Sequence, residues 1–330
     1  MKARLQYLLF AFLFAWPVIA MQSCLPFLNA GASCNSTGQN AHYSAATPAE
    51  FSEFNPRPQA IPLQRKRLHE ISGIAASLQY KNRLYVQEDN GHPNYLYVTN
   101  SRGDDVGRLL ISKSLNRDWE DIAVGPGPLP QQQYIYIADI GDNHAWRCRI
   151  QIYRLPEPEL EGRVVPVHKI VKGVDVITLK YPDRSHNAET ILLDPFTRDL
   201  YIATKEDDSC RIFVARYPQS TRNTITLEPV IKLPFHLVTS GNIASNGQEI
   251  LLRNEQLYWY WKRSPGETVA AALSRPPQEI VPGINEPQGE AICFTADRQG
   301  YFTCSEVHGK QEPVIYFYKR GIITMQAKNP

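Results

Sequence analysis

Three glutamates occupy the same place in successive units of the chain. Glu120, Glu189 and Glu290 each stand two residues before the first apolar residue of a short strand-like segment. Carboxylates that converge in a confined space repel one another unless a cation neutralises them or some of them take up a proton. Oxygen ligands without Cys or His favour a hard ion, Ca²⁺ before Mg²⁺, although another divalent metal also fits. These glutamates are our candidate metal ligands; in the alternative, they cap strand amides or pair with Arg around a water-filled channel.

A second set of polar residues lies close to these glutamates in each unit. Some of them neighbour the glutamate position itself, and others take the fifth position of the second strand, where that strand runs into a loop. Loops that gather at one edge of a scaffold commonly carry the binding residues, although capping of turns by Asx side chains is the more frequent reason for such residues. The candidate ligand contacts are Glu70, Glu88, Asp121, Asp139, Asp142, Asn143, Thr204, Asn242, Asn254 and Ser305.

Two of the polar residues are also candidates for acid–base chemistry. His186 is close to the glutamate at 189, and Asp139 begins the most acidic loop of the chain. With a metal on the glutamates, either residue is suited to activate a water molecule as a general base. A turn histidine without a catalytic role is the commoner case. No Gly-x-Ser-x-Gly motif and no Ser-His-Asp order occurs, which disfavours a covalent serine hydrolase.

The elements that must position these residues are short strands in an internal repeat. Segments 70–75, 119–123, 188–192, 240–244 and 289–293 each begin with polar residues and continue as an apolar strand, and two or more Tyr-, Ile- and Val-rich strands follow each one. Units of about 50 residues with three or four strands are typical of a β-propeller. We therefore expect an all-β chain with five blades. The alternatives are a sixth blade around Val174, Ile177 and Leu179, or a β-sandwich whose strands merely look alike.

The repeat also predicts how the ring closes. The last unit has no convincing fourth strand, and residues 60–64 are suited to supply it from the N-terminal side, which would remove a free sheet edge. The first strand of each blade lines the central channel of a propeller. The glutamate position would then form a ring around that channel.

Composition and the N-terminal sequence limit the function classes. The 330 residues are 43% hydrophobic, and 35 Lys and Arg face 33 Asp and Glu, which excludes a disordered chain and the basic footprint of a nucleic-acid binder. Lys2 and Arg4 precede an apolar run that is too short to span a bilayer. We therefore predict a signal peptide at 1–20, an extended leader or tether at 21–60, and a single propeller domain at 61–330. We expect the mature protein to be exported: periplasmic, secreted or tethered to the outer surface, with a lipid anchor at Cys24 as one alternative.

Six cysteines lie outside the predicted signal peptide. An oxidising compartment permits disulfides, and Cys293 and Cys304 flank an expected hairpin turn. We expect a bridge between these two, with free buried thiols as the alternative.

Several motifs carry a family resemblance. Residues 119–123 (WEDIA), 140–143 (IGDN) and 152–158 (IYRLPEP) recur in the same order in a widespread group of exported bacterial β-propellers, mostly of unassigned function, which this chain resembles. More distantly it is similar to the SdiA-regulated and the gluconolactonase–regucalcin propellers, whose channels hold a divalent metal. The resemblance implies that Glu120, Glu189 and Glu290 face the channel.

Taken together, the sequence favours an exported propeller with Ca²⁺ or another divalent cation at its channel, acting as a ligand-binding or interaction module. Its partner would be a small molecule or a protein at the channel mouth. The alternative is a metal-dependent hydrolase of lactonase or phosphoesterase type.

Overall fold

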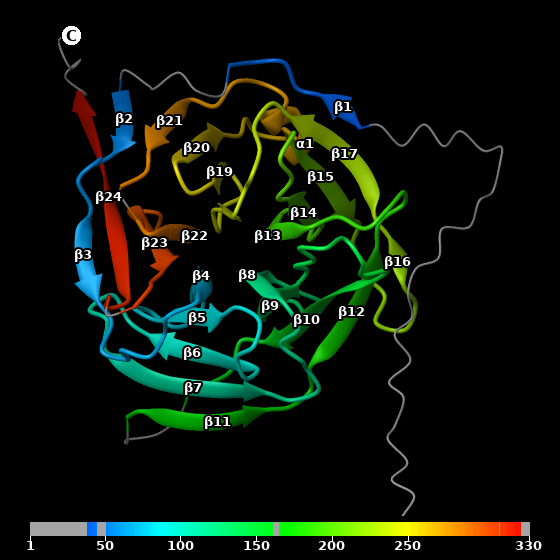
Figure 1. The fold of residues 1–330 in the computed structure, drawn as a ribbon. Helices are drawn as coiled ribbons and strands as arrows, with labels where there is room; N and C mark the ends of the chain where they lie inside the picture. The colour runs from blue at the N-terminus through cyan, green and yellow to red at the C-terminus, as the bar shows by residue number, and fades with distance from the viewer. Residues whose placement is uncertain (1–37, 45–50, 161–164, 285, 310, 325–330) are drawn as a thin grey trace, which may run out of the picture.

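The computed structural model describes residues 38–44, 51–160, 165–284, 286–309 and 311–324. The expected signal peptide at 1–20 and Cys24 lie outside these residues. Five sheets stand around a central channel, so the predicted five-bladed propeller is confirmed (Figure 1). In each blade the first strand lies at the channel, and the following strands pair antiparallel outward from it.

The first three blades each contain four strands in chain order. Blade 1 comprises β4 (Ile71–Ala76), β5 (Leu84–Glu88), β6 (Tyr95–Thr99) and β7 (Asp105–Ile111). Blade 2 comprises β8 (Trp119–Pro126), β9 (Gln133–Asp139), β10 (Ile150–Pro156) and β12 (Asp175–Lys180). Blade 3 comprises β13 (Ala188–Leu193), β14 (Leu200–Thr204), β15 (Cys210–Ala215) and β17 (Glu228–Leu233).

The last two blades differ in their outer parts. Blade 4 comprises β18 (Ser240–Ile243), β19 (Glu249–Arg253), β20 (Leu257–Lys262) and β21 (Glu279–Pro282), with the short helix α1 (Val269–Leu273) between its last two strands. Blade 5 comprises β22 (Gln288–Phe294), β23 (Gly300–Glu306) and β24 (Val314–Thr324). No helix in the described part of the chain is long and apolar enough to cross a membrane.

An N-terminal strand closes the ring, as predicted. Strand β3 (Gln59–Pro62) pairs antiparallel with β24, and Ile61 lies opposite Ile315. Strand β2 (Phe51–Phe54) pairs with the far end of the same β24. The expected leader at 21–60 therefore contributes β2 and the first two residues of β3 to blade 5.

Three more strands lie outside the blades and pair in parallel with the outermost strand of a blade. Strand β11 (Val167–Val171) adds to β7 of blade 1, although it follows β10 of blade 2 in the chain. Strand β16 (Ile225–Thr226) adds to β12 in the same way, and β1 (Gln39–Asn40) adds to β17. The insertion of β11 makes the second unit long. The described residues contain no sixth blade, because Ile177 and Leu179 belong to β12 of blade 2.

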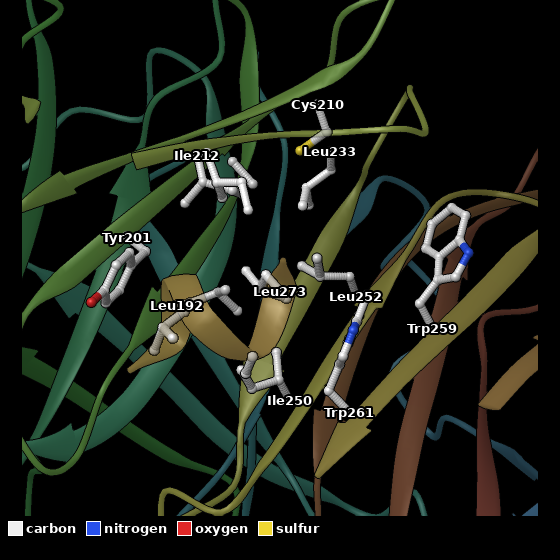
Figure 2. Packing of buried hydrophobic residues seen from close by; sticks show 14 of the residues in the cluster. Leu192, Tyr201, Cys210, Ile212, Leu233, Ile250, Leu252, Trp259, Trp261 and Leu273 are labelled. Carbon is white, nitrogen blue, oxygen red and sulfur yellow. The ribbon is translucent and has the colours of Figure 1, made fainter. Parts of the chain in front are cut away.

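The cores lie between neighbouring blades. Figure 2 shows one of them, in which Leu192 and Ile212 of blade 3 face Leu252 and Trp261 of blade 4, with Leu273 of α1 beside them. A single thin sheet cannot bury both faces by itself, and the facing blades provide that burial.

The expected bridge between Cys293 and Cys304 is wrong, because both are free, buried thiols. The strand register explains the error. In the β22–β23 hairpin Cys293 lies opposite Phe302, and Cys304 lies opposite Ala291. Both thiols pack into the apolar core between blades 5 and 1.

Candidate functional site

The glutamate position coincides with an irregularity in the inner strands. The pairing with the second strand shifts register across Ser72 in β4, Glu120 in β8, Glu189 in β13 and Glu290 in β22. In blade 4 the pairing passes Gly241 without a shift. A shift of this kind is a β-bulge, which inserts one residue into a strand and re-aims a side chain. Four blades therefore present their bulged residue at the start of the inner strand.

Two of the three glutamates share one ammonium group. Lys205 Nζ lies 2.7 Å from Glu189 Oε2 and 3.7 Å from Glu290 Oε1. Gln288 Nε2 donates a hydrogen bond of 3.0 Å to Glu290 Oε1. Both glutamate side chains are almost fully buried. Blades 3 and 5, which are separate in the ring, therefore meet at this lysine.

The third glutamate belongs to a different cluster. One oxygen each from Asp89, Asp118 and Glu120 lie within 4.8 Å of one another. Asn90 Nδ2 donates to Asp118 Oδ1 at 2.7 Å. The cluster therefore joins the start of β8 to the loop that follows β5, and its spacing suits three ligands of one cation.

A glycine of the acidic loop lies against this cluster. A Cβ atom at Gly141 would collide with Glu120 Oε1 and Asp118 Oδ2. The amides of Ile140 and Gly141 donate to the carbonyl of Asp118 at 3.2 and 3.3 Å. The loop therefore approaches the carboxylates with its backbone, and only glycine leaves room for them.

The buried carboxylates of the channel mouth repel one another, which disfavours their simultaneous ionisation. Burial, and then the charges of Glu189, Asp89, Asp118 and Glu290, raise the pKa of Glu120 well above its usual value. Burial and Glu290 likewise raise the pKa of Glu189, with Lys205 opposing them.

Two carboxylates nearer the rim respond in the same way. Burial is the main cause that raises the pKa of Asp89 to about 7, and Asp118 and Glu290 add to it. Burial, followed by Glu290 and Asp89, raises the pKa of Glu306 to about 8. A bound cation would favour the ionised carboxylates and so oppose these shifts.

Most residues at the fifth position of the second strand accept hydrogen bonds from backbone amides of their own blade. Asn254 Oδ1 accepts from the amides of Gln256 and Leu257, and Thr204 Oγ1 accepts from the amide of Arg211. Ser305 Oγ accepts from the amide of Gln288. These contacts match the capping role that was the alternative interpretation.

The acidic residues of the first two blades are held in the same manner. Glu88 accepts from the amide of His69, and His92 Nε2 lies 2.8 Å from Glu70. The Asp142 carboxylate accepts from the amides of Trp146 and Arg147. Asn143 Oδ1 accepts from Asn187 Nδ2 at 3.0 Å.

Both candidate bases are engaged with neighbouring charged side chains. Asp139 is fully buried and lies 2.8 Å from Arg147 Nη2. His186 is also buried, with Nδ1 2.8 Å from Glu206 and Nε2 3.0 Å from Asp183. Both imidazole nitrogens are therefore occupied by fixed neighbours.

Asp121 and Asn242 join inner strands of different blades. Asp121 accepts from the amides of Ile122 and Ile191 and from Ser240 Oγ. Asn242 Oδ1 accepts from the amide of Phe294. These side chains link inner strands of different blades through those hydrogen bonds.

Sequence reasoning missed four residues of the channel mouth: Asp89, Asp118, Lys205 and Glu306. Three of them share a signal, because Asp89, Lys205 and Glu306 each stand one residue beyond the fifth position of the second strand. Asp118 precedes β8 directly and has no equivalent in that pattern. The relevant position is therefore the residue after the fifth position, which follows β5 and β14 and is the last residue of β23.

Comparison with known proteins adds little beyond the fold. No family model and no curated protein matches the chain. Among solved structures it is similar to the Dos1 propeller, with a TM-score of 0.34 and 13% identity over 76% of this chain and 68% of that chain. A similarity at this level carries no argument about function.

Proposed function

We propose that this protein is an exported ligand-binding module whose channel mouth holds a divalent cation, Ca²⁺ before other metals. The observation that carries the proposal is the placement of Asp89, Asp118 and Glu120, with one oxygen from each within 4.8 Å of the others. Ca²⁺ takes carboxylate oxygens at about 2.3–2.6 Å, which requires that ligands lie at such mutual distances.

The geometry favours a different ligand set from the three glutamates of the repeat. Lys205 already supplies a positive charge to Glu189 and Glu290. Asp89, Asp118 and Glu120 have no comparable ammonium among the ion pairs of the described residues. We therefore propose Asp89, Asp118 and Glu120 as ligands, with Glu189 and Glu290 contributing to the negative field.

The surroundings of the cluster support a preformed site. Asn90 orients Asp118, and the Gly141 backbone lies directly behind Glu120 and Asp118. Fixed outer contacts of this kind orient ligands before the metal arrives. A binding role is favoured over hydrolysis because Asp139 and His186 are engaged with other side chains.

Export is part of the proposal and rests on the N-terminal sequence. A basic start, a short apolar run and Ala20 have the organisation of a signal peptide. An extracellular or periplasmic location supplies Ca²⁺ at concentrations at which weak sites are occupied (on the order of 10⁻⁴–10⁻³ M).

Thermal unfolding with and without Ca²⁺ tests the proposal. We expect Ca²⁺ to raise Tm relative to EDTA, because a ligand that binds only the folded state stabilises it. Glu120→Gln and Asp118→Asn should each abolish the shift. Asp297→Asn, in the turn at the opposite end of blade 5, is the matched control and should keep it. Equal Tm in EDTA and in 5–10 mM Ca²⁺ (on the order of ten times the affinity of weak extracellular sites), with no metal in elemental analysis, would overturn the proposal.

A further inference from the structure

Two Asn-Gly pairs in the chain, Asn90-Gly91 and Asn246-Gly247, have different surroundings. Asparagine is among the thermally labile residues. It deamidates when the backbone nitrogen of the next residue attacks its side-chain Cγ, and glycine in the next position leaves that nitrogen unshielded. The hydrogen bonds of each pair therefore decide whether the reaction can occur.

The second pair is restrained at both reacting groups. Gly247 N donates to the carbonyl of Ala244 at 2.7 Å in the turn between β18 and β19. Asn246 Oδ1 accepts from the amide of Gln248 at 3.2 Å, and Asn246 Nδ2 donates to Gln248 Oε1 at 2.9 Å. Attack on Cγ would have to break all three hydrogen bonds.

The first pair is open. Asn90 and Gly91 are exposed in the turn between β5 and β6. Gly91 has a φ of 78°, and no atom lies within 4 Å of a Cβ placed there. Its N–H donates no hydrogen bond to any residue that the structure describes. The attacking nitrogen is therefore accessible, and the Asn90 amide is held by its donation to Asp118 Oδ1 at 2.7 Å.

We propose that Asn90 is a site of spontaneous deamidation, which turns a neutral hydrogen-bond donor of the channel mouth into a carboxylate. The Gly91 nitrogen loses its proton and bonds to Asn90 Cγ, and the bond from Cγ to Nδ2 breaks, so that ammonia leaves and a succinimide remains. Water then opens this ring at either carbonyl and gives aspartate or isoaspartate. No electron is exchanged with another reagent.

The reaction would change the cation site directly. Where Asn90 Nδ2 donates to Asp118, the product places a negative oxygen beside a carboxylate. Like charges at that distance repel one another in the absence of a cation. With a cation bound, the additional carboxylate strengthens the site, because the charge of the ligands sets Ca²⁺ affinity.

Peptide mapping of the full chain after incubation at mildly alkaline pH tests the modification. We expect the amide-to-acid mass change at Asn90 to appear at least about tenfold faster than at Asn246, because fewer hydrogen bonds must break. Gly91→Ala should slow the change at Asn90 at least about tenfold by shielding the attacking nitrogen. Asn90→Gln, which keeps the amide on a longer side chain, should likewise remain unmodified and serves if Gly91→Ala is unstable.

The product variant tests the consequence. Asn90→Asp should lower Tm in EDTA and bind Ca²⁺ at least about threefold more tightly than the unaltered protein. Asn246→Asp, at the opposite end of the propeller, is the matched control and should change neither. The Ca²⁺ readout rests on the proposed function, whereas the mapping and the Tm in EDTA do not. Absence of Ca²⁺ binding by the unaltered protein would therefore contradict the proposed function alone.

Two results would each overturn the inference. The first is modification of Asn90 that is no faster than that of Asn246. The second is an Asn90→Asp variant whose Tm in EDTA and Ca²⁺ titration both match those of the unaltered protein, which would place the new charge away from Asp118.

Discussion

The ammonium group of Lys205 lies 2.7 Å from Glu189 Oε2 and so places one positive charge among the carboxylates of the channel mouth. Burial alone would lower the pKa of Lys205, but Glu189 and Glu290 raise it. The lysine therefore stays charged and acts as a built-in counter-ion.

Replacing this lysine should destabilise the propeller. We expect Lys205→Gln to lower the free energy of unfolding by about 2 kcal/mol, because it leaves buried carboxylates unpaired at a site that water partly reaches. Urea denaturation in EDTA measures the change. The double variant Lys205→Gln/Glu189→Gln should recover about half of the loss. Lys66→Gln, which removes an exposed pair with Glu312, should cost less than about 0.5 kcal/mol. A loss no larger for Lys205 than for Lys66 would contradict the counter-ion role.

The second prediction concerns Gly141. A methyl group there would meet Glu120 and Asp118, so Gly141→Ala should displace both carboxylates and weaken Ca²⁺ binding at least about tenfold. Calorimetric titration with Ca²⁺ measures the affinity. Gly321→Ala is the matched control, because no atom lies within 4 Å of a Cβ at that exposed position. Normal Ca²⁺ affinity in Gly141→Ala would show that the cation binds elsewhere.

Stability without metal should depend on pH in a direction set by the carboxylates. The pKa of Glu306 rises to about 8 and that of Asp89 to about 7, so the folded state holds protons that the unfolded chain has released. The free energy of unfolding therefore falls as pH rises from about 4.5 to about 8.

Thermal unfolding in EDTA between pH 5 and pH 9 checks this expectation. We expect Glu306→Gln to remove about 1 kcal/mol of the fall, a value reduced for solvent screening at a partly exposed group. Saturating Ca²⁺ should flatten the profile as well. A Tm that rises across this range in EDTA would contradict the assignment.

Ring closure by β3 makes a fourth prediction. Ile61 is 6% exposed and packs against the core between blades 5 and 1. Ile61→Ala should cost about 2–4 kcal/mol in urea denaturation, as for other buried truncations. Ile170→Ala, at a strand position that is 59% exposed, should cost less than about 0.5 kcal/mol. Equal costs would mean that β3 contributes little to closure.

The blades were predictable because each inner strand repeats the same polar-to-apolar transition. That transition reflects one physical requirement, since each inner strand starts with polar residues and its next residues enter the core between blades. Strands β11, β16 and β1 were not predictable. Parallel pairing at an outer edge depends on where a loop passes, and short segments such as 225–226 carry no periodicity of their own.

The site was predictable only in part for a similar reason. The glutamates occupy one repeated position of the inner strands. Asp89 and Lys205 follow the ends of β5 and β14, and Glu306 is the last residue of β23, so alternation along the strand fixes the direction of these side chains poorly. The cysteine error has the same origin. Counting symmetrically from the turn between β22 and β23 missed the true register by two residues, with Cys293 opposite Phe302 and not Cys304.

The parallel edge strands tie the timing of folding to the order of synthesis. Blade 1 ends at Ile111, but its outer edge stays unprotected until Val167–Val171 has been made, by which time the ribosome has already produced three strands of blade 2. Blade 2 waits in turn for residues between the third and fourth strands of blade 3. Blades 1 and 2 thus each take an outer edge strand from the unit that follows. Deleting the unit that follows blade 1 or blade 2 would leave that blade with an exposed edge strand, which favours aggregation. These units therefore cannot be added or removed independently.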